Sequence, residues 1–299
     1  MLSILNSAII KTTTLLPKSI VQLFAGKYVA GENHNTALNV VKSLNEQGYS
    51  ATIDILGEHV ETISEANQIT NEYLKLYDEI AEAQLDCNIS IKPSHIGLDL
   101  GENEFLRNLA LLIDKAKSHD NFLRIDMESS MVTDITIKAY EIMLKSSTAV
   151  GTVFQAYLFR TLDDIKNIQN DHLNFRLCKG IYKESKDISI QDRNHINENY
   201  LKILRYSFIA KNYVGIATHD INLLKDVYVL IEELNVSPEN FEFQVLYGVP
   251  MSGWLEKHLE MGYKVRVYVP FGPDWYDYSI RRLKENPNIA GYVIKNLFR

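Results

Sequence analysis

Short apolar segments alternate with longer segments of helical spacing along most of this chain. Between the apolar segments, hydrophobic residues recur every three to four positions, as in residues 65–83 and 104–119. Strands that alternate with helices pair in parallel, and eight such units in 299 residues indicate a closed barrel rather than an open sheet. The pattern therefore predicts an α/β fold, a (β/α)8 barrel of TIM type. Its strands are expected at residues 49–56, 88–92, 122–127, 150–157, 174–179, 214–218, 241–246 and 264–269.

The first of these strands begins late in the chain, so residues 1–47 are expected to form an N-terminal segment of one or two extra helices. The barrel is expected to occupy residues 48–287, followed by a C-terminal tail at 288–299. No linker, low-complexity segment or block of charge interrupts the chain. We therefore expect a single domain over residues 1–299.

Composition and charge exclude several classes of protein. The net charge of −7 argues against a nucleic-acid partner, which normally requires a basic face. No apolar run of about 18 residues predicts a transmembrane helix, and the N-terminal apolar stretch lacks the basic segment of a secretory signal. Two cysteines, Cys87 and Cys178, form no disulfide framework, and the eight histidines lack metal-ligand spacing. We expect a cytoplasmic protein without a metal.

Ionisable residues lie in register on several of the predicted strands. Because side chains alternate between the two faces of a strand, Arg124, Asp126 and Glu128 share one face. An unpaired buried charge is unfavourable, so charges that roughly cancel indicate a polar lumen that opens at the C-terminal strand ends, where barrel active sites lie. A purely structural ion network is the alternative. The same alternation pairs Arg176 with Cys178, Glu242 with Gln244 and Ser90 with Lys92.

Two motifs follow predicted strands. RLCKGIYKE (176–184) places a cation and a glycine at a strand end, where backbone amides and a lysine could hold a phosphate; a solvated lysine beside a turn glycine is the alternative. Alternation puts Arg176 and Lys179 on opposite faces unless the strand ends before Lys179. In ATHD (217–220), the polar residues could cap the next helix or face the barrel mouth.

The C-terminal segment VRVYVPFGPDWYDYSIRRLKENP (265–287) carries the most chemistry. Asp274 is a suitable N-cap for a helix after the last strand. On that helix Tyr278, Arg281 and Arg282 share one face with Glu285, at spacings of three and four residues. Arginine binds carboxylates through paired hydrogen bonds, so this face could bind a small carboxylate. A solvated basic helix end is the alternative.

Together these segments resemble the proline dehydrogenase family in its short, monofunctional bacterial form. The resemblance runs from about Asp54 to Pro287 and is most specific in RLCKGIY (176–182), ATHD (217–220), FEFQVLYGVP (241–250) and RVYVPFGPDWYDYSIRRLKENP (266–287). It implies a distorted (β/α)8 barrel that binds FAD without a covalent bond and oxidises L-proline to 1-pyrroline-5-carboxylate. It also implies that a quinone accepts the electrons, with peripheral contact on the inner face of the membrane.

The resemblance assigns roles to residues that would bind the substrate. Arg281 and Arg282 would bind the proline carboxylate, with Lys92 as a third cation. Tyr268 would pack on the proline ring, and Asp126 would order these groups as an active-site acid. The resemblance further places Tyr278 and either Leu246 or Tyr247 in the pocket wall, and either Glu58 or Glu61 as a lid carboxylate.

The cofactor site follows from the same resemblance. Arg176 would lie near flavin N5. The other predicted FAD contacts are Met127, Gln155, Lys179, Gly180, Ile181, Thr218 and His219.

Two functions of other classes remain open from the residues alone. A cofactor-free lyase of the aldolase type could use Lys92 or Lys179 to form a Schiff base. A non-catalytic protein that binds a small amino acid is the second. The terminal segments MLSILNSAII and NIAGYVIKNLFR could lie at a membrane interface or pack on the barrel.

Overall fold

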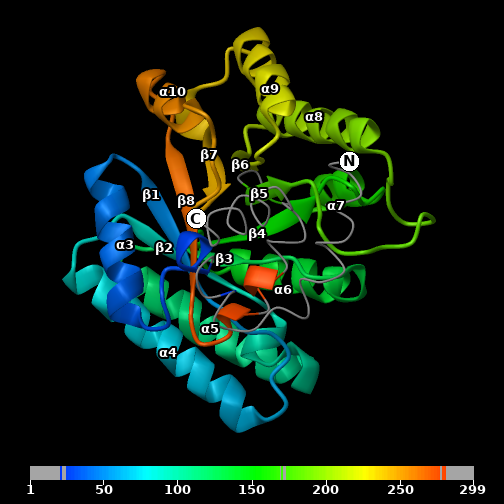
Figure 1. The fold of residues 1–299 in the computed structure, drawn as a ribbon. Helices are drawn as coiled ribbons and strands as arrows, with labels where there is room; N and C mark the ends of the chain where they lie inside the picture. The colour runs from blue at the N-terminus through cyan, green and yellow to red at the C-terminus, as the bar shows by residue number, and fades with distance from the viewer. Residues whose placement is uncertain (1–20, 22–24, 169, 171–172, 277, 281–299) are drawn as a thin grey trace.

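Eight parallel strands close a barrel in chain order (Figure 1). The structure is a computed structural model that describes residues 21, 25–168, 170, 173–276 and 278–280. β1 pairs with β2 on one side and with β8 on the other. All eight predicted strands are confirmed, with ends that differ by at most two residues. They are β1 Ser50–Ile55, β2 Cys87–Ile91, β3 Leu123–Ile125, β4 Val150–Gln155, β5 Asn174–Cys178, β6 Tyr213–Ala217, β7 Phe241–Leu246 and β8 Val265–Phe271.

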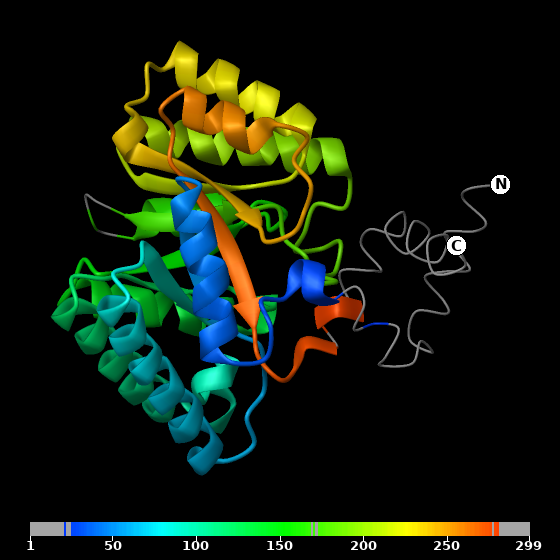
Figure 2. The same ribbon diagram turned by 60° about the vertical axis from the view of Figure 1, so that its left-hand side comes forward.

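Helices surround the barrel and cover the outer face of its strands (Figure 1). α3 (His34–Glu46) precedes the barrel and lies along β8 and β1 (Figure 2), which confirms an extra N-terminal helix. The C-terminal tail predicted at 288–299 lies outside the described residues. The remaining helices are α4 Ile63–Glu82, α5 Glu102–Ser118, α6 Thr133–Leu144, α7 Thr161–Asn167, α8 Arg193–Ile209, α9 Ile221–Glu233 and α10 Trp254–Glu260, with short 3-10 turns between some of them.

Local sequence sets the helix starts. Thr62 begins α4 with a capping box: its side chain accepts from the Glu65 amide, and the Glu65 carboxylate accepts from the Thr62 amide. Asp220 begins α9 by accepting hydrogen bonds from the amides of Asn222 and Leu223. The capping role expected of the ATHD motif is therefore confirmed for Asp220.

Buried tyrosines attach the helices to the barrel. Tyr140 of α6 donates its hydroxyl proton to the Asn174 carbonyl, and Tyr200 of α8 donates to the Leu177 carbonyl. Each ring fills the apolar layer between helix and strand, while its hydroxyl satisfies a backbone acceptor. Among the described helices, none is long and apolar enough to cross a membrane.

Candidate active site

A cluster of buried polar side chains, here called the upper cluster, lies near the C-terminal ends of the strands. Its centre is Asp126, directly after β3. The Asp126 carboxylate accepts hydrogen bonds from Arg176 of β5, from the Ser90 hydroxyl at 2.7 Å and from the Tyr268 hydroxyl at 2.9 Å. The Arg176 guanidinium also lies 5.0 Å from the centre of the Tyr268 ring, within cation–π range. Residues from four strands or strand ends therefore meet at one carboxylate.

Asp54 of β1 adds a second carboxylate to the upper cluster. Its Oδ2 atom accepts from Lys92 Nζ at 2.7 Å and lies 2.8 Å from the Tyr268 hydroxyl. The hydroxyl has a single proton, so Tyr268 can donate to Asp54 or to Asp126 but not to both at once. Asp54 Oδ1 accepts from Tyr73 of α4 at 3.1 Å. Two cations and two carboxylates are thus linked through one phenol.

Burial and charge together set the protonation states in this cluster. Burial raises the pKa of Asp54, and the Lys92 ammonium opposes that rise. Burial lowers the pKa of Lys92, but the charges of Asp54 and Asp126 outweigh it and leave that pKa raised. Burial and the same two carboxylates raise the pKa of Tyr268 far above its ordinary value. Lys92 therefore stays protonated, and Tyr268 keeps its proton at neutral pH.

A second set of charges, here called the lower cluster, lies at the opposite end of the lumen. Arg266 Nε donates to Glu242 Oε1 at 2.8 Å, and Arg124 donates to the carbonyls of Thr152 and Asn174. Arg124, Asn174, Glu242 and Arg266 line an open depression of about 700 Å³ together with residues at the N-terminal strand ends. The prediction that Arg124 and Glu242 share a lumen opening at the C-terminal ends is therefore wrong. Alternation predicts the face of a strand, but it does not predict the height along the barrel axis.

The segment after β5 separates two residues that the RLCKGIY motif holds close together. β5 ends at Cys178, so Lys179 lies beyond the strand and bonds Asp220 at 2.6 Å, away from Arg176. Gly180 has a φ of 108°, and an added Cβ would lie 2.2 Å from the Tyr157 ring. Glycine is therefore required there by packing within the chain. Ile181, predicted to contact FAD, is 61% exposed.

The other predicted cofactor contacts gather around the ends of β3, β4 and β6. Met127 is buried directly after Asp126. Gln155 donates to the Glu128 carbonyl at 2.9 Å. His219 accepts from the Leu246 amide through Nε2 at 3.0 Å, so a neutral His219 ring carries its proton on Nδ1. Thr218 is buried at the end of β6.

Of the predicted substrate residues, Lys92 and Tyr268 belong to the upper cluster. Tyr278 is buried in a small apolar cluster with Tyr28, Val29 and Leu56, the residue that follows β1. Leu246 ends β7, and the Tyr247 amide donates to the Tyr268 carbonyl. The proposed carboxylate clamp, Arg281 and Arg282, lies outside the described residues, as does Glu285.

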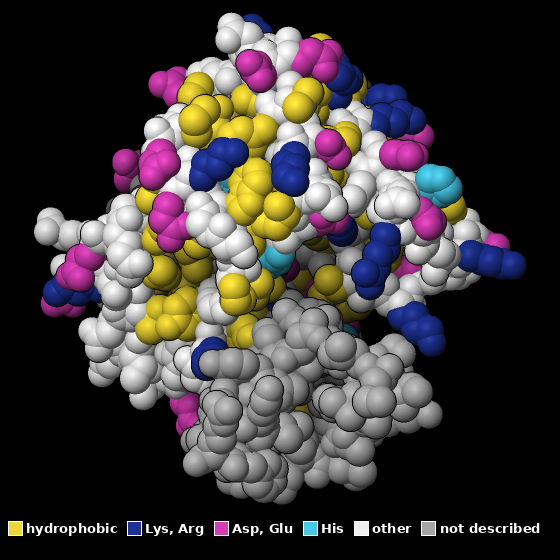
Figure 3. All heavy atoms as spheres, turned by 45° about the horizontal axis from the view of Figure 1, so that its top comes forward, with side chains coloured by type: hydrophobic (Ala, Val, Ile, Leu, Met, Phe, Trp, Pro, Cys, Tyr) yellow, Lys and Arg dark blue, Asp and Glu magenta, His cyan; other side chains and the backbone are white. Residues whose placement is uncertain are grey.

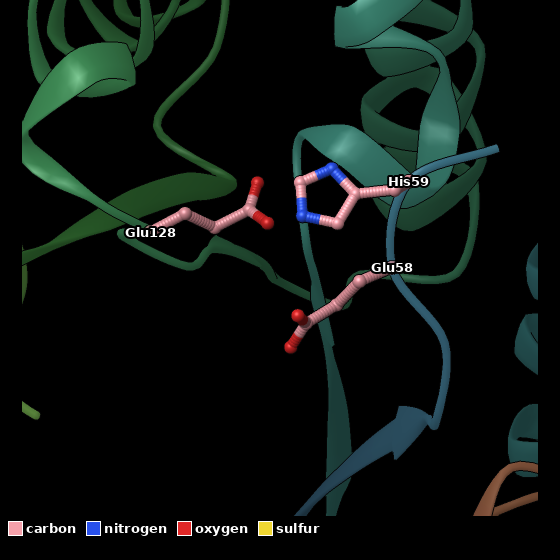
Figure 4. A group of neighbouring side chains, drawn as sticks. All are labelled: Glu58, His59 and Glu128. Atoms are coloured by element: carbon pink, nitrogen blue, oxygen red, sulfur yellow. The ribbon is translucent and has the colours of Figure 1, made fainter. Parts of the chain in front are cut away.

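The two candidate lid glutamates lie in different places. Glu58 lies near His59 and Glu128 at the C-terminal end of the barrel (Figure 4). Glu61 precedes α4, and its backbone amide donates to the Glu65 carboxylate. The structure therefore brings Glu58, and not Glu61, to the end of β3.

Sequence reasoning missed Asp54 as a site residue. Its signal was present, because Ser50, Thr52 and Asp54 alternate with Ala51, Ile53 and Ile55 along β1. Tyr73 was also missed. A buried tyrosine on a helix has no sequence signal that distinguishes a bond to a site carboxylate from ordinary packing.

Charged side chains of both signs are distributed over the surface. On the face in Figure 3, Lys and Arg side chains are interspersed with Asp and Glu rather than gathered into a basic patch.

The fold and the upper cluster define a (β/α)8-barrel protein with a charge-balanced site near the C-terminal ends of its strands. A model of the family described as "Proline dehydrogenase" matches residues 37–294. The chain belongs to the proline dehydrogenase family.

Relatives and solved structures agree with this assignment. The chain is 38% identical over 290 residues to "Proline dehydrogenase 1" of Bacillus subtilis subsp. natto, covering 97% of this chain and 96% of that protein. It is 33% identical over 281 residues to "Proline dehydrogenase" of Deinococcus radiodurans, covering 92% and 90%. The fold matches crystalline proline utilization A from Bdellovibrio bacteriovorus, inactivated by N-propargylglycine, with a TM-score of 0.81 at 23% identity. That match covers 88% of this chain and 32% of the larger protein, and it shows the fold alone.

Proposed function

We propose that this protein oxidises L-proline to 1-pyrroline-5-carboxylate with bound FAD, the first step of proline catabolism to glutamate. The observation that carries the proposal is the upper cluster, in which Lys92, Arg176 and Tyr268 are held by Asp54 and Asp126 at the C-terminal end of a family barrel. Barrel enzymes place their chemistry at this end.

The residues around this cluster fit a flavin. Arg176 bonds Asp126 through Nη2, and a guanidinium has further N–H donors for an electron-rich ring. Gln155 donates through its side-chain nitrogen, which leaves its oxygen as an acceptor. Lys179 offers a cation for a phosphate, although Asp220 would have to share it. When bound, the flavin would supply the two-electron acceptor for the hydride of proline C5.

The chain's own residues would bind and orient proline. Lys92, together with Arg281 and Arg282, would bind the carboxylate, and the Tyr268 ring would pack on the apolar ring of the substrate. Asp126 fixes the positions of both Arg176 and Tyr268, so it would orient the cofactor side and the substrate side of the site at once. The buried Arg176 cation would stabilise negative charge that builds on the reduced ring.

The structure disfavours the aldolase-type alternative. A Schiff base forms only from a neutral amine, but Lys92 is ion-paired with Asp54 and its pKa is raised. Lys179 is likewise paired, with Asp220 at 2.6 Å. Neither lysine is in the apolar, unpaired environment that activates an amine.

A quinone as electron acceptor is part of the same proposal, as is peripheral membrane contact of a cytoplasmic protein. Both rest on the family resemblance. The terminal segments that could provide the contact, MLSILNSAII and NIAGYVIKNLFR, lie outside the described residues.

Flavin spectroscopy tests the proposal directly. The purified protein should be yellow, and L-proline added without oxygen should bleach the flavin absorbance. A protein that binds proline but has no flavin, and that FAD does not reconstitute, would be a binding protein. A protein that forms a borohydride-trapped adduct with a keto substrate would be a lyase. Either result overturns the oxidation of proline.

A further inference from the structure

Three potential metal ligands meet at the C-terminal end of the barrel, outside the upper cluster. Glu58 and His59 lie in the connection between β1 and α4, and Glu128 follows β3. One ligand atom from each lies within 4.8 Å of the others. In Figure 4 the Glu128 carboxylate points toward the His59 ring, and the Glu58 carboxylate lies below both of them. The spacing of histidines along the chain does not indicate such a site, because its ligands come from two distant connections.

The His59 ring is held in the way that metal-bound histidines are held. Its Nδ1 atom lies 2.6 Å from Asp99 Oδ2, so Nδ1 carries a proton toward that carboxylate and Nε2 is the nitrogen that remains for a ligand. Most metal-binding histidines make such a bond with their second nitrogen, which fixes the ring orientation and makes the ligand more basic. His59 also has a φ of 56°, in the left-handed region that most residues avoid.

Ser94 joins both sides of the group. Its hydroxyl and amide donate to the two Glu128 oxygens, at 2.6 and 2.8 Å. The same hydroxyl oxygen accepts from the His59 amide at 3.3 Å. Carboxylate ligands of metals are commonly hydrogen-bonded in this manner, and each Glu128 oxygen has a second lone pair for a cation. One hydroxyl thus positions the backbone of one ligand and the carboxylate of another.

The charges of the group favour a cation. Glu58, Glu128 and Asp99 surround one imidazole, and the nearby Lys92 is paired with Asp54 at 2.7 Å. A single oxygen of Glu58 suffices as a ligand, so the other interactions of that side chain can persist. Mixed imidazole and carboxylate ligands suit first-row divalent ions.

We propose that His59, Glu58 and Glu128 bind one divalent transition-metal ion of the Zn²⁺ class across the C-terminal end of the barrel. Bonds of about 2.0–2.2 Å in tetrahedral geometry place ligand atoms roughly 3.3 Å apart. The ligand atoms, which lie within 4.8 Å of one another, therefore have to approach by at most about 1.5 Å. Glu58 is half-buried and the His59 side chain is 70% exposed, which leaves room for this movement.

The ion has a consequence for turnover, and this part rests on the proposed function. It holds the connection that carries Glu58, the candidate lid carboxylate, against the end of β3. An occupied site is therefore expected to slow proline oxidation by restricting movement of this connection at the C-terminal end of the barrel. The binding itself is independent of proline chemistry.

Zn²⁺ binding to the untagged holoprotein, measured by equilibrium dialysis and elemental analysis near pH 7.5, tests the site. We expect one Zn²⁺ per chain, with affinity at least tenfold weaker in His59→Gln and about 10–100-fold weaker in Asp99→Asn, which removes the partner of the ring. His195→Gln is the matched control, because exposed His195 also lies near a carboxylate, Asp192, at 3.8 Å. Absence of stoichiometric binding, or equal binding by His59→Gln and His195→Gln, overturns the site.

Proline turnover at fixed Zn²⁺ occupancy tests the consequence. Turnover should fall when the wild-type site is filled, recover on chelation, and be insensitive to the same Zn²⁺ concentration in His59→Gln. Unchanged turnover at full occupancy overturns the proposed effect on turnover. A protein that fails to oxidise proline at all still reports on the site through dialysis, so the two proposals fail separately.

Discussion

The two ends of the barrel lumen differ in the hydrogen-bond partners of their buried charged side chains. In the lower cluster, Arg124 donates to the carbonyls of Thr152 and Asn174, and Arg266 donates to Glu242 and to the Ala51 carbonyl. The lower cluster thus combines one ion pair with several backbone acceptors, whereas Lys92, Arg176 and Tyr268 of the upper cluster bond the Asp54 and Asp126 side chains. Backbone acceptors cannot move without breaking the barrel, whereas side chains can exchange partners when a ligand arrives. The lower end is therefore built for stability and the upper end for binding.

The lower cluster links strands around the circumference. Arg266 of β8 reaches β7 through Glu242 and β1 through the Ala51 carbonyl at 2.6 Å. Arg124 of β3 reaches β4 through Thr152 and β5 through Asn174. Burial and the neighbouring Arg176 charge lower the pKa of Arg124 to about 10, which still leaves it charged at neutral pH. The hydrogen bonds of two arginines thus link six of the strands.

The largest effect on stability is expected from Glu242→Gln. The change leaves the Arg266 cation buried without its counter-charge, and breaking such a pair costs about 3–5 kcal/mol. Turnover of the folded protein should stay within about threefold, because Glu242 is remote from the upper cluster. Urea unfolding and proline turnover measure the two effects. A large fall in turnover with unchanged stability would reverse the roles of the two ends.

The largest effect on turnover is expected from Arg176→Met in the upper cluster. Removal of one preorganised charge at a reacting centre commonly lowers the rate by about 10²–10³. Proline-driven flavin reduction should therefore fall by that factor, measured in a stopped-flow instrument without oxygen. Arg176→Lys should recover part of the rate, since a cation remains. Equal rates in Met and Lys variants would show that charge is not what matters at this position.

A smaller effect is expected from Arg281→Met or Arg282→Met, which remove a cation from the proposed carboxylate clamp. A charge-assisted hydrogen bond contributes about 1.5–3 kcal/mol, so the Michaelis constant for proline should rise roughly 10–100-fold. Flavin content should remain normal. If either variant loses FAD while the remaining holoenzyme binds proline normally, the arginine belongs to the cofactor site.

Strand positions and strand faces could be predicted from the sequence, because side-chain alternation and residue type are local properties. The polar face of β3 was correctly placed in the lumen for Arg124 and Asp126, which are buried there. The division of Arg124 and Asp126 between two clusters could not be predicted, since the stagger of neighbouring strands decides which residues lie at the same height along the barrel axis. The register that pairs Ser90 with Arg124, and Gln244 with Arg266, sets this height in the folded barrel.

Contacts between distant connections were also beyond sequence reasoning. The Glu128 carboxylate bonds Ser94, and the Lys179 ammonium bonds Asp220. Each pair joins the ends of two strands, and the chain sequence contains no local pattern for such a pair. The family resemblance names residues such as Lys179, but it does not show that Asp220 competes for its charge.

The smallest effect concerns pH and a buried histidine at the upper end. Burial, and then the Lys92 charge, lower the pKa of His95 to about 4, whereas an unfolded histidine has a pKa near 6.5. Between these values the unfolded chain binds the proton and the folded chain does not. The contribution of His95 is therefore complete above pH 6.5 and is lost as pH falls toward 4. Between pH 7 and pH 5.5 the loss of folding stability that His95 causes amounts to about 1 kcal/mol.

Urea unfolding of wild type and His95→Gln at both pH values should show a smaller loss of stability in the variant. His258, whose pKa burial also lowers to about 4, is part of α10, outside the lumen, and remains in both proteins. It should therefore contribute to the slope that remains in the variant. Equal slopes in the two proteins would show that His95 is already charged in the fold, and that the upper end tolerates a third cation.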